Sequence, residues 1–115
     1  MQRGQVRMVE FEPTRGAEAN KRRPAIIVSN DSANSVAARL GHGVLTVVPV
    51  TSNIRRVYPF QVLLPSGAGG LPHDSKAQAE QIRSIDIERV GPLLGSLSAQ
   101  LMGLVENALR LHLTL

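Results

Sequence analysis

Two short polar clusters carry the side chains of this sequence that are best suited to chemistry on a phosphate. The first is the basic triplet Lys21-Arg22-Arg23, which comes directly before an apolar run that starts at Ala25. Pro24 and this run should fix the backbone of Arg23, and an arginine held rigidly at the mouth of a strand is a good bidentate phosphate ligand. Most basic triplets in proteins, however, form only a solvated face.

The second cluster is Thr51-Ser52-Asn53, three hydrogen-bonding side chains at the C-terminal end of the most apolar run, Val44 to Val50. A polar turn that leaves a sheet has the same composition, and composition alone favours that structural interpretation. The sequence therefore leaves both interpretations of this cluster open.

The common catalytic motifs are missing from the sequence. His42, His73 and His112 are dispersed and fit no zinc-binding spacing, so we interpret them as surface or loop residues. The SGAGG segment lacks the GK[ST] of a phosphate-binding loop, and no GxSxG nucleophile motif occurs. Cysteine is absent, and the acidic residues are scattered rather than paired. We therefore expect no metal and no cofactor, and chemistry that uses arginine, hydroxyl, amide and single carboxylate groups.

The elements that must position these side chains are short. Alternating or continuous apolar residues predict five strands. They cover Gln5 to Phe11, Ala25 to Ser29, Val44 to Val50, Gln61 to Leu64 and Lys76 to Ile82. Pro49 inside the third strand suggests an edge position or a bulge.

Helical turns are expected over Ala33 to Leu40 and near Ile85 to Val90, the second ended by Gly91 and Pro92. The last segment, from Ser98 to about His112, has the apolar spacing of a helix with Ser98 as its N-cap.

This order predicts one domain, residues 1–115, that is mainly β with α: a small barrel or strongly curved sheet with the C-terminal helix packed against it. The last helix is apolar around much of its circumference, which predicts burial or a dimer contact. The polar connection from Glu12 to Arg23 is long, and loops of this length are usually functional or mobile.

Composition limits the classes of partner that we expect for this chain. The net charge of +4 raises the expectation of a polyanionic partner, whereas only three aromatic residues argue against a passive base-stacking module. No apolar run is long enough to span a membrane, and the start of the chain does not resemble a signal peptide. We expect a cytoplasmic protein with no membrane partner.

Several blocks of the sequence are familiar. RGQVRMVEFEPTRGAEANKRRPAIIVSND, VVPVTSN, DSKAQAEQIRSID and GSLSAQLMGLVENAL follow one another over nearly the whole chain. The chain thereby resembles the MazF/Kid (PemK-like) family of toxin endoribonucleases of type II toxin-antitoxin systems.

This resemblance implies an SH3-like barrel of the CcdB/MazF type, a homodimer, and a groove at the dimer interface that receives single-stranded RNA. It implies sequence-specific, metal-independent cleavage to 2′,3′-cyclic phosphate and 5′-hydroxyl ends, which inhibits translation and growth. It also implies a cognate antitoxin, normally a small protein with an acidic, disordered tail.

The resemblance also assigns residues. Arg23, in RPA, and Thr51, in PVTS, match the positions to which the family's chemistry is usually assigned. Some relatives have an arginine and an aspartate where this chain has Gln78 and Glu80, and Glu80 is therefore a candidate for proton transfer. By analogy, RNA contacts fall on Arg15, Glu18, Lys21, Arg22, Ser52, Asn53 and Gln81. Arg83 and Asp86 are interpreted as a structural pair at the barrel or dimer interface.

The alternative function is a non-catalytic, CcdB-like toxin that poisons a protein target such as DNA gyrase. The presence of both Arg23 and Thr51 in their motif contexts favours the nuclease, because CcdB-like chains are not expected to keep that pair.

Overall fold

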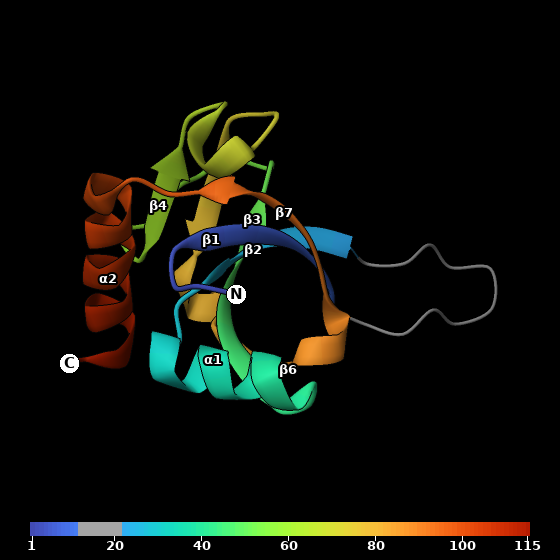
Figure 1. Cartoon of the computed structure of the whole chain (residues 1–115). Helices are drawn as coiled ribbons and strands as arrows, with labels where there is room; N and C mark the ends of the chain where they lie inside the picture. The colour runs from blue at the N-terminus through green and yellow to red at the C-terminus, as the bar shows by residue number, and fades with distance from the viewer. Residues whose placement is uncertain (12–21) are drawn as a thin grey trace, which may run out of the picture.

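The computed structural model describes residues 1–11 and 22–115, and in this part of the chain seven short strands form one strongly curved antiparallel sheet (Figure 1). The strands are β1 (Gln5–Glu10), β2 (Arg22–Ile27), β3 (Val44–Thr51), β4 (Gln61–Leu64), β5 (Ser75–Gln78), β6 (Arg83–Asp86) and β7 (Val90–Ser96). The helices are α1 (Asp31–Leu40) and α2 (Ala99–Leu113), and the 3-10 turns are η1 (Ala68–Gly70), η2 (Ala79–Gln81) and η3 (Ile87–Arg89). The predicted small barrel with a C-terminal helix is confirmed.

Most of the sheet is built on β3. The strand order is β4-β5-β3-β2-β1-β7, with β6 also paired to β3. One edge of β3 pairs with β2, and the other pairs with β6 as far as Val47 and with β5 from Val50 onward. Pro49 lies between these two partners, so its missing N–H removes no ladder hydrogen bond. The edge position suggested for Pro49 is therefore wrong, because β3 is a central strand.

The barrel closes where η1 meets β7. The η1 turn follows β4, at one end of the strand order, and packs against β7, at the other end. A Cβ atom on Gly70 would overlap the carbonyl oxygen of Leu94, and one on Gly95 would lie 2.7 Å from the carbonyl carbon of Gly69. Glycine is needed because only a residue without a side chain lets two backbones approach this closely.

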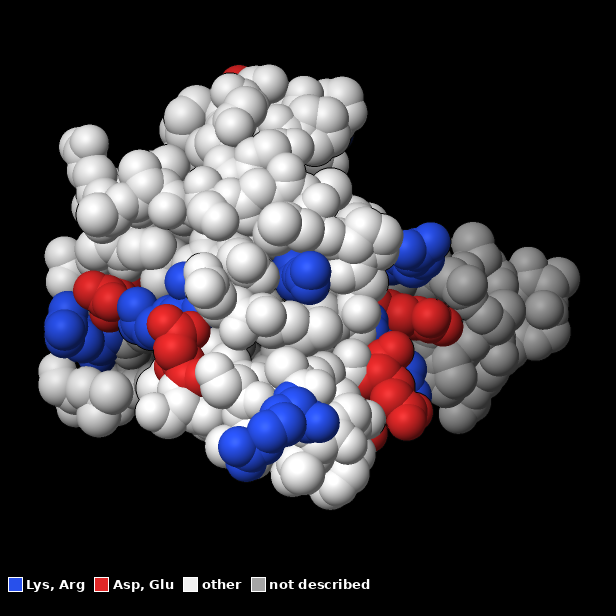
Figure 2. Space-filling model, viewed as in Figure 1, with Lys and Arg blue, Asp and Glu red and all other residues white. Residues whose placement is uncertain are grey.

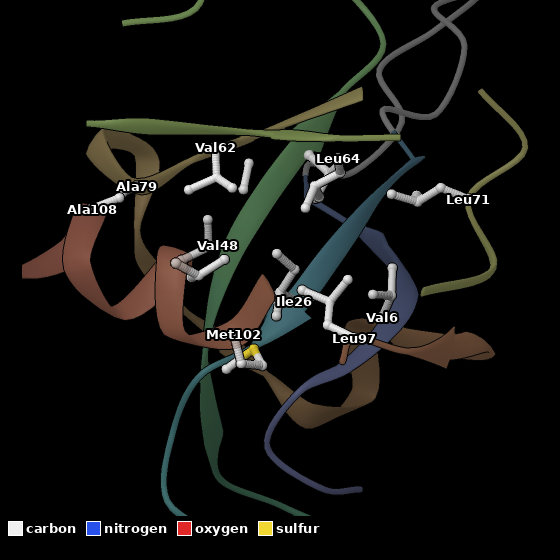
Figure 3. Packing of buried hydrophobic residues seen from close by; sticks show 13 residues of the cluster. Val6, Ile26, Val48, Val62, Leu64, Leu71, Ala79, Leu97, Met102 and Ala108 are labelled. Carbon is white, nitrogen blue, oxygen red and sulfur yellow. The ribbon is translucent and has the colours of Figure 1, made fainter. Parts of the chain in front are cut away.

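The alternation of β2 and β3 supplies two cores, one on each face of these strands. Ile26, Val48 and Val50 belong to the larger core, which Met102 and Val105 of α2 complete (Figure 3). Ala25, Ile27, Leu45 and Val47 belong to the smaller core, together with Ala37 of α1 and Phe11. The apolar face of α2 is thus anchored by burial, as its sequence predicts.

Both helices are capped, α2 by the predicted Ser98. The Asn30 side chain accepts a hydrogen bond from the Ala33 N–H, and Gly41 ends α1 in the left-handed conformation. The Ser98 hydroxyl accepts from the Leu101 N–H at the start of α2.

Arg3 ties the two helices to the start of the chain. Its guanidinium forms a 2.7 Å ion pair with Glu106 of α2, and its backbone N–H donates to the Asp31 carboxylate of α1. This backbone hydrogen bond, aided by one from Asn34, lowers the pKa of Asp31. None of the described helices is long and apolar enough to cross a membrane.

In the second half, one predicted strand is too long, and one predicted helical turn is present only as the shorter η3 turn. The strand expected over Lys76 to Ile82 ends at Gln78, because η2 interrupts it before β6 begins at Arg83. The helical turn expected near Ile85 to Val90 consists of the end of β6 and the η3 turn. Gly91 and Pro92 do not end a helical turn, because they lie in β7. This strand lacks apolar alternation. It tolerates proline because it stands at the end of the sheet order.

We expect Gly70→Ala and Gly95→Ala to destabilise the fold by roughly 2 kcal/mol or more, because each added Cβ forces two backbones apart. Thermal unfolding followed by circular dichroism measures the effect. Gly103→Ala in α2 is the matched control, since its Cβ meets nothing within 4 Å, and it should stabilise by up to about 1 kcal/mol. Native-like melting of Gly70→Ala would contradict the closure.

Candidate active site

The register of β2 and β3 brings Arg23 and Thr51 together. Ala25 is paired with Pro49 in this antiparallel ladder. This is the last pair of the ladder, and Arg23 and Thr51 lie two residues beyond it, at the start of β2 and the end of β3. Side chains alternate along a strand, so both belong to the same face of their strands. The two clusters that the sequence singled out thus meet in space.

Arg23 and Thr51 also line a pocket of about 410 Å³ where the start of β2, the end of β3 and the segment 71–75 converge. We call it the strand-end pocket. Its wall is completed by Met8 of β1 and Leu94 of β7. The full lining is Met8, Arg22, Arg23, Pro24, Val50, Thr51, Ser52, Leu71, Pro72, His73, Ser75 and Leu94.

The Thr51-Ser52-Asn53 cluster forms a polar turn, and two of its side chains also line the site. The Thr51 hydroxyl oxygen accepts a 3.2 Å hydrogen bond from the Asn53 N–H, and the Asn53 side chain accepts one from the Arg55 N–H. A hydroxyl that accepts in this way still has its own hydrogen to donate. Thr51 is therefore held in place with a donor left for a ligand oxygen.

Glu80 and Gln81 lie on η2, and neither lines the strand-end pocket. The Glu80 Oε2 atom accepts a 2.7 Å hydrogen bond from the buried Gln61 side chain. Its Oε1 atom is buried and has no hydrogen-bond partner among the described residues. Gln81 is exposed. η2 directly follows β5, the strand that pairs with the end of β3. Glu80 therefore lies just beyond β5 and not beside Arg23.

The structure describes only some of the other predicted RNA contacts. Arg15, Glu18 and Lys21 lie outside the described residues. Arg22, Ser52 and Asn53 are exposed, and the first two line the strand-end pocket with Arg23 and Thr51.

The expected pairing of Arg83 with Asp86 is wrong. The Arg83 guanidinium lies over the Phe11 ring, 5.3 Å from its centroid, and the Asp86 carboxylate accepts from the Glu88 N–H to cap η3. Each residue is structural, but with a different partner.

An aromatic cluster next to the site was missed from the sequence. The rings of Tyr58 and Phe60 stack in parallel with their centroids 5.4 Å apart, and His112 of α2 lies against Phe60. The Lys76 ammonium is 6.0 Å from the Tyr58 centroid, and Lys76 is the register partner of Thr51. The available signal was the spacing of Tyr58 and Phe60, which puts both rings on one side of an extended segment.

The distribution of charge differs between the surface seen in Figure 2 and the strand-end pocket. Figure 2 shows acidic and basic side chains intermixed on one face, with no continuous basic surface there. The strand-end pocket differs, because its described lining holds two arginines and no carboxylate. Among the described residues, no group of three or more histidines and carboxylates is placed to hold a metal ion.

The fold and the site define a small antiparallel barrel with a polar pocket at the ends of two adjacent strands. Residues 2–113 match the sequence model of the PemK-like, MazF-like toxins of type II toxin-antitoxin systems, and the chain belongs to this family.

Its relatives include the endoribonuclease MazF9 of Mycobacterium tuberculosis, which is 57% identical over 115 residues, covering 100% of this chain and 98% of that protein. A MazE-MazF crystal structure from Deinococcus radiodurans matches with a TM-score of 0.80 and 29% identity, over 100% of this chain and 96% of the other. A mycobacterial endoribonuclease in complex with its cognate antitoxin shares the fold, with a TM-score of 0.78 and 24% identity over 100% and 96% of the two chains.

Proposed function

We propose that this chain is the toxin of a type II toxin-antitoxin pair and acts as a sequence-specific endoribonuclease on single-stranded RNA. Cleavage needs no metal, leaves 2′,3′-cyclic phosphate and 5′-hydroxyl ends, and inhibits translation and growth. The observation that carries this proposal is the meeting of Arg23 and Thr51 in one pocket, in a chain 57% identical over its whole length to a named endoribonuclease.

RNA supplies its own nucleophile, so the protein has little covalent chemistry to perform. The 2′-oxygen forms a bond to phosphorus, the P–O5′ bond breaks with its electron pair on the 5′-oxygen, and this oxygen takes a proton from water to become the 5′-hydroxyl. Arg23 neutralises the charge that develops on the non-bridging oxygens, and Thr51 donates its hydroxyl hydrogen to one of them. Both side chains line one pocket, so they can act on one phosphoryl group.

We propose Glu80 as the group that accepts the 2′-hydroxyl proton. One of its oxygens is held by Gln61, and the other is buried and unpartnered among the described residues. A general base must lie within hydrogen-bond distance of the 2′-hydroxyl beside Arg23 and Thr51, so the assignment requires η2 to bring Glu80 toward the strand-end pocket when RNA binds. Arg15, Glu18, Lys21, Arg22, Ser52, Asn53 and Gln81 are the proposed RNA contacts.

A homodimer is part of the proposal. Leu104 and Leu111 of α2 and Leu63 of β4 are about half exposed and line one depression of about 410 Å³. Exposed apolar side chains in such numbers mark interaction surfaces.

The antitoxin and the compartment complete the proposal. The cognate antitoxin would place its acidic tail across the arginines at the start of β2, and toxin and antitoxin would meet in the cytoplasm.

A CcdB-like toxin that poisons DNA gyrase without catalysis is the weaker candidate. The chain belongs to the MazF-like family and retains both Arg23 and Thr51, side chains that a poison of a protein target would not need.

Purified protein should cut a defined single-stranded RNA at one short word in EDTA, with cyclic-phosphate ends. Arg23→Ala and Thr51→Ala should each lower kcat roughly 100- to 1,000-fold, because each removes a donor to the transition state. Arg39→Ala, an exposed arginine on α1, is the control and should cut like the native protein. If the folded toxin, freed of antitoxin, cuts nothing in a diverse RNA pool, gyrase becomes the next target to test.

Glu80→Gln should lower kcat roughly 100-fold or more, because an amide cannot take up the proton. The Gln61 hydrogen bond can persist, since the amide oxygen still accepts. Glu88→Gln, which changes an exposed carboxylate on η3, should leave the rate unchanged. A native-like kcat for Glu80→Gln would eliminate Glu80 as the base.

Charge reversal of Arg22 and Arg23 to glutamate should weaken binding of the antitoxin's acidic tail at least roughly tenfold, through like-charge repulsion. Isothermal titration with the tail peptide measures the change. The double variant Arg39→Glu and Arg110→Glu has the same net charge and should bind normally. Equal affinities for the two double variants would place the tail elsewhere.

A further inference from the structure

The strand-end pocket can do more than hold a phosphate. We propose that it binds the nucleobase adjoining the scissile phosphate, that it prefers a base with a carbonyl oxygen at position 4 or 6, uracil or guanine, and that Arg22 and His73 recognise this base. The inference deepens the proposed nuclease activity and rests on it, since a base is bound there only if the chain binds RNA.

Position is the first argument. Arg23 and Thr51, which would hold the scissile phosphate, belong to the rim of the same pocket as His73. Ser52 follows Thr51 directly, and continuing the β3–β5 register by one residue places it opposite Ser75 of the pocket wall. A nucleotide whose phosphate lies at Arg23 therefore has its base within reach of this pocket.

Size and walls are the second argument. The pocket measures about 410 Å³, within the roughly 300–1,000 Å³ of sites for small organic molecules. Its apolar wall comes from separate elements: Met8 of β1, Pro24 of β2, Leu71 and Leu94 of β7. Apolar walls with a few converging polar groups are the usual environment of a flat heteroaromatic ring.

The polar groups give the pocket its preference. Arg22 offers only donors, and the imidazole of His73 offers at least one donor. The Ser75 hydroxyl already donates its hydrogen to the His73 carbonyl oxygen. No carboxylate lines the described part of the pocket. Where uracil and guanine carry a carbonyl oxygen (O4 or O6), cytosine and adenine carry an amine that needs an acceptor. The donor-rich lining therefore favours uracil and guanine.

The segment that carries His73 is held on both sides. The Asp74 carboxylate accepts a 2.7 Å hydrogen bond from the Ser66 N–H, and the Ser66 hydroxyl donates to the Pro72 carbonyl oxygen. Before this segment, Gly70 is fixed against β7. A recognising side chain on a fixed backbone loses little freedom on binding, which increases selectivity.

The experiment begins with the native toxin, freed of antitoxin, on a random single-stranded RNA pool whose cleavage word is read by sequencing the ends. Oligoribonucleotides with that word are then synthesised with each of the four bases, or an abasic residue, at every position. We expect one position flanking the cut where uracil or guanine raises kcat/KM roughly tenfold or more over adenine, cytosine and the abasic residue.

Two variants test the pocket. His73→Ala removes a recognising group, and Leu94→Trp fills the space, with thermal unfolding as the check that both fold. In each, the preference at that one position should fall toward equal rates while the preferences at other positions persist. His42→Ala, an exposed histidine in the turn between α1 and β3, is the matched control and should keep the native word.

Each outcome bears on the proposal. If the native toxin cuts and both variants keep its word, the pocket does not bind the base, and this inference alone is overturned. A preference for adenine or cytosine at the position that responds to His73→Ala would overturn the donor argument. Failure of the native toxin to cut any RNA would overturn the proposed function and this inference together.

Discussion

The contact between η1 and β7 is the constraint on which the site depends. The sheet has two ends, and they are joined where Gly69 and Gly70 meet the backbone of Leu94 and Gly95. The segment from Leu71 to Ser75 leaves η1 directly and forms one side of the strand-end pocket, while Leu94 forms another. An open sheet would still keep Arg23 near Thr51, because those residues belong to adjacent strands. It would, however, separate Leu94 and the segment from Leu71 to Ser75 from the rest of the pocket.

A second constraint acts within β3. Its outer edge changes partner from β6 to β5, and the proline at the change has no N–H that would require a third partner. The chain between the two partner strands cannot continue as one strand, so it forms η2, which carries Glu80 and Gln81. The polar residues around the site thus lie where regular pairing stops: at the ends of β2 and β3 and in the gap between β5 and β6. A sheet that paired without interruption would leave no backbone free to present them.

Sequence patterns predicted the strands and the helix whose apolar side chains are buried in the core. β3, β4 and α2 match their expected ranges closely, because continuous apolar runs and helical spacing respond directly to the core. Arg23 and Thr51 were recognisable because each follows or precedes such a run. What could not be predicted depends on pairing between distant strands: the pairing of β2 with β3 that brings the two residues to one pocket, the break at η2, and β7, whose glycines and proline resemble a turn. His73 was interpreted as a loop residue, and it is one. Its place beside the site follows from barrel closure, which no local pattern encodes.

The pairing of β1 with β7 joins the first and last described strands, with Gln5 opposite Ser96. Closing a loop of that length loses much chain entropy before any contact compensates for it, and folds dominated by such non-local pairs form slowly. During synthesis, β1 is made before the other described strands and has no partner on this side until β7 has left the ribosome. A chain whose translation stops before β7 keeps one edge of β1 unpaired and has an incomplete strand-end pocket. For a protein proposed to halt translation, the order of strands along the chain therefore delays assembly of the full site until β7 has been made.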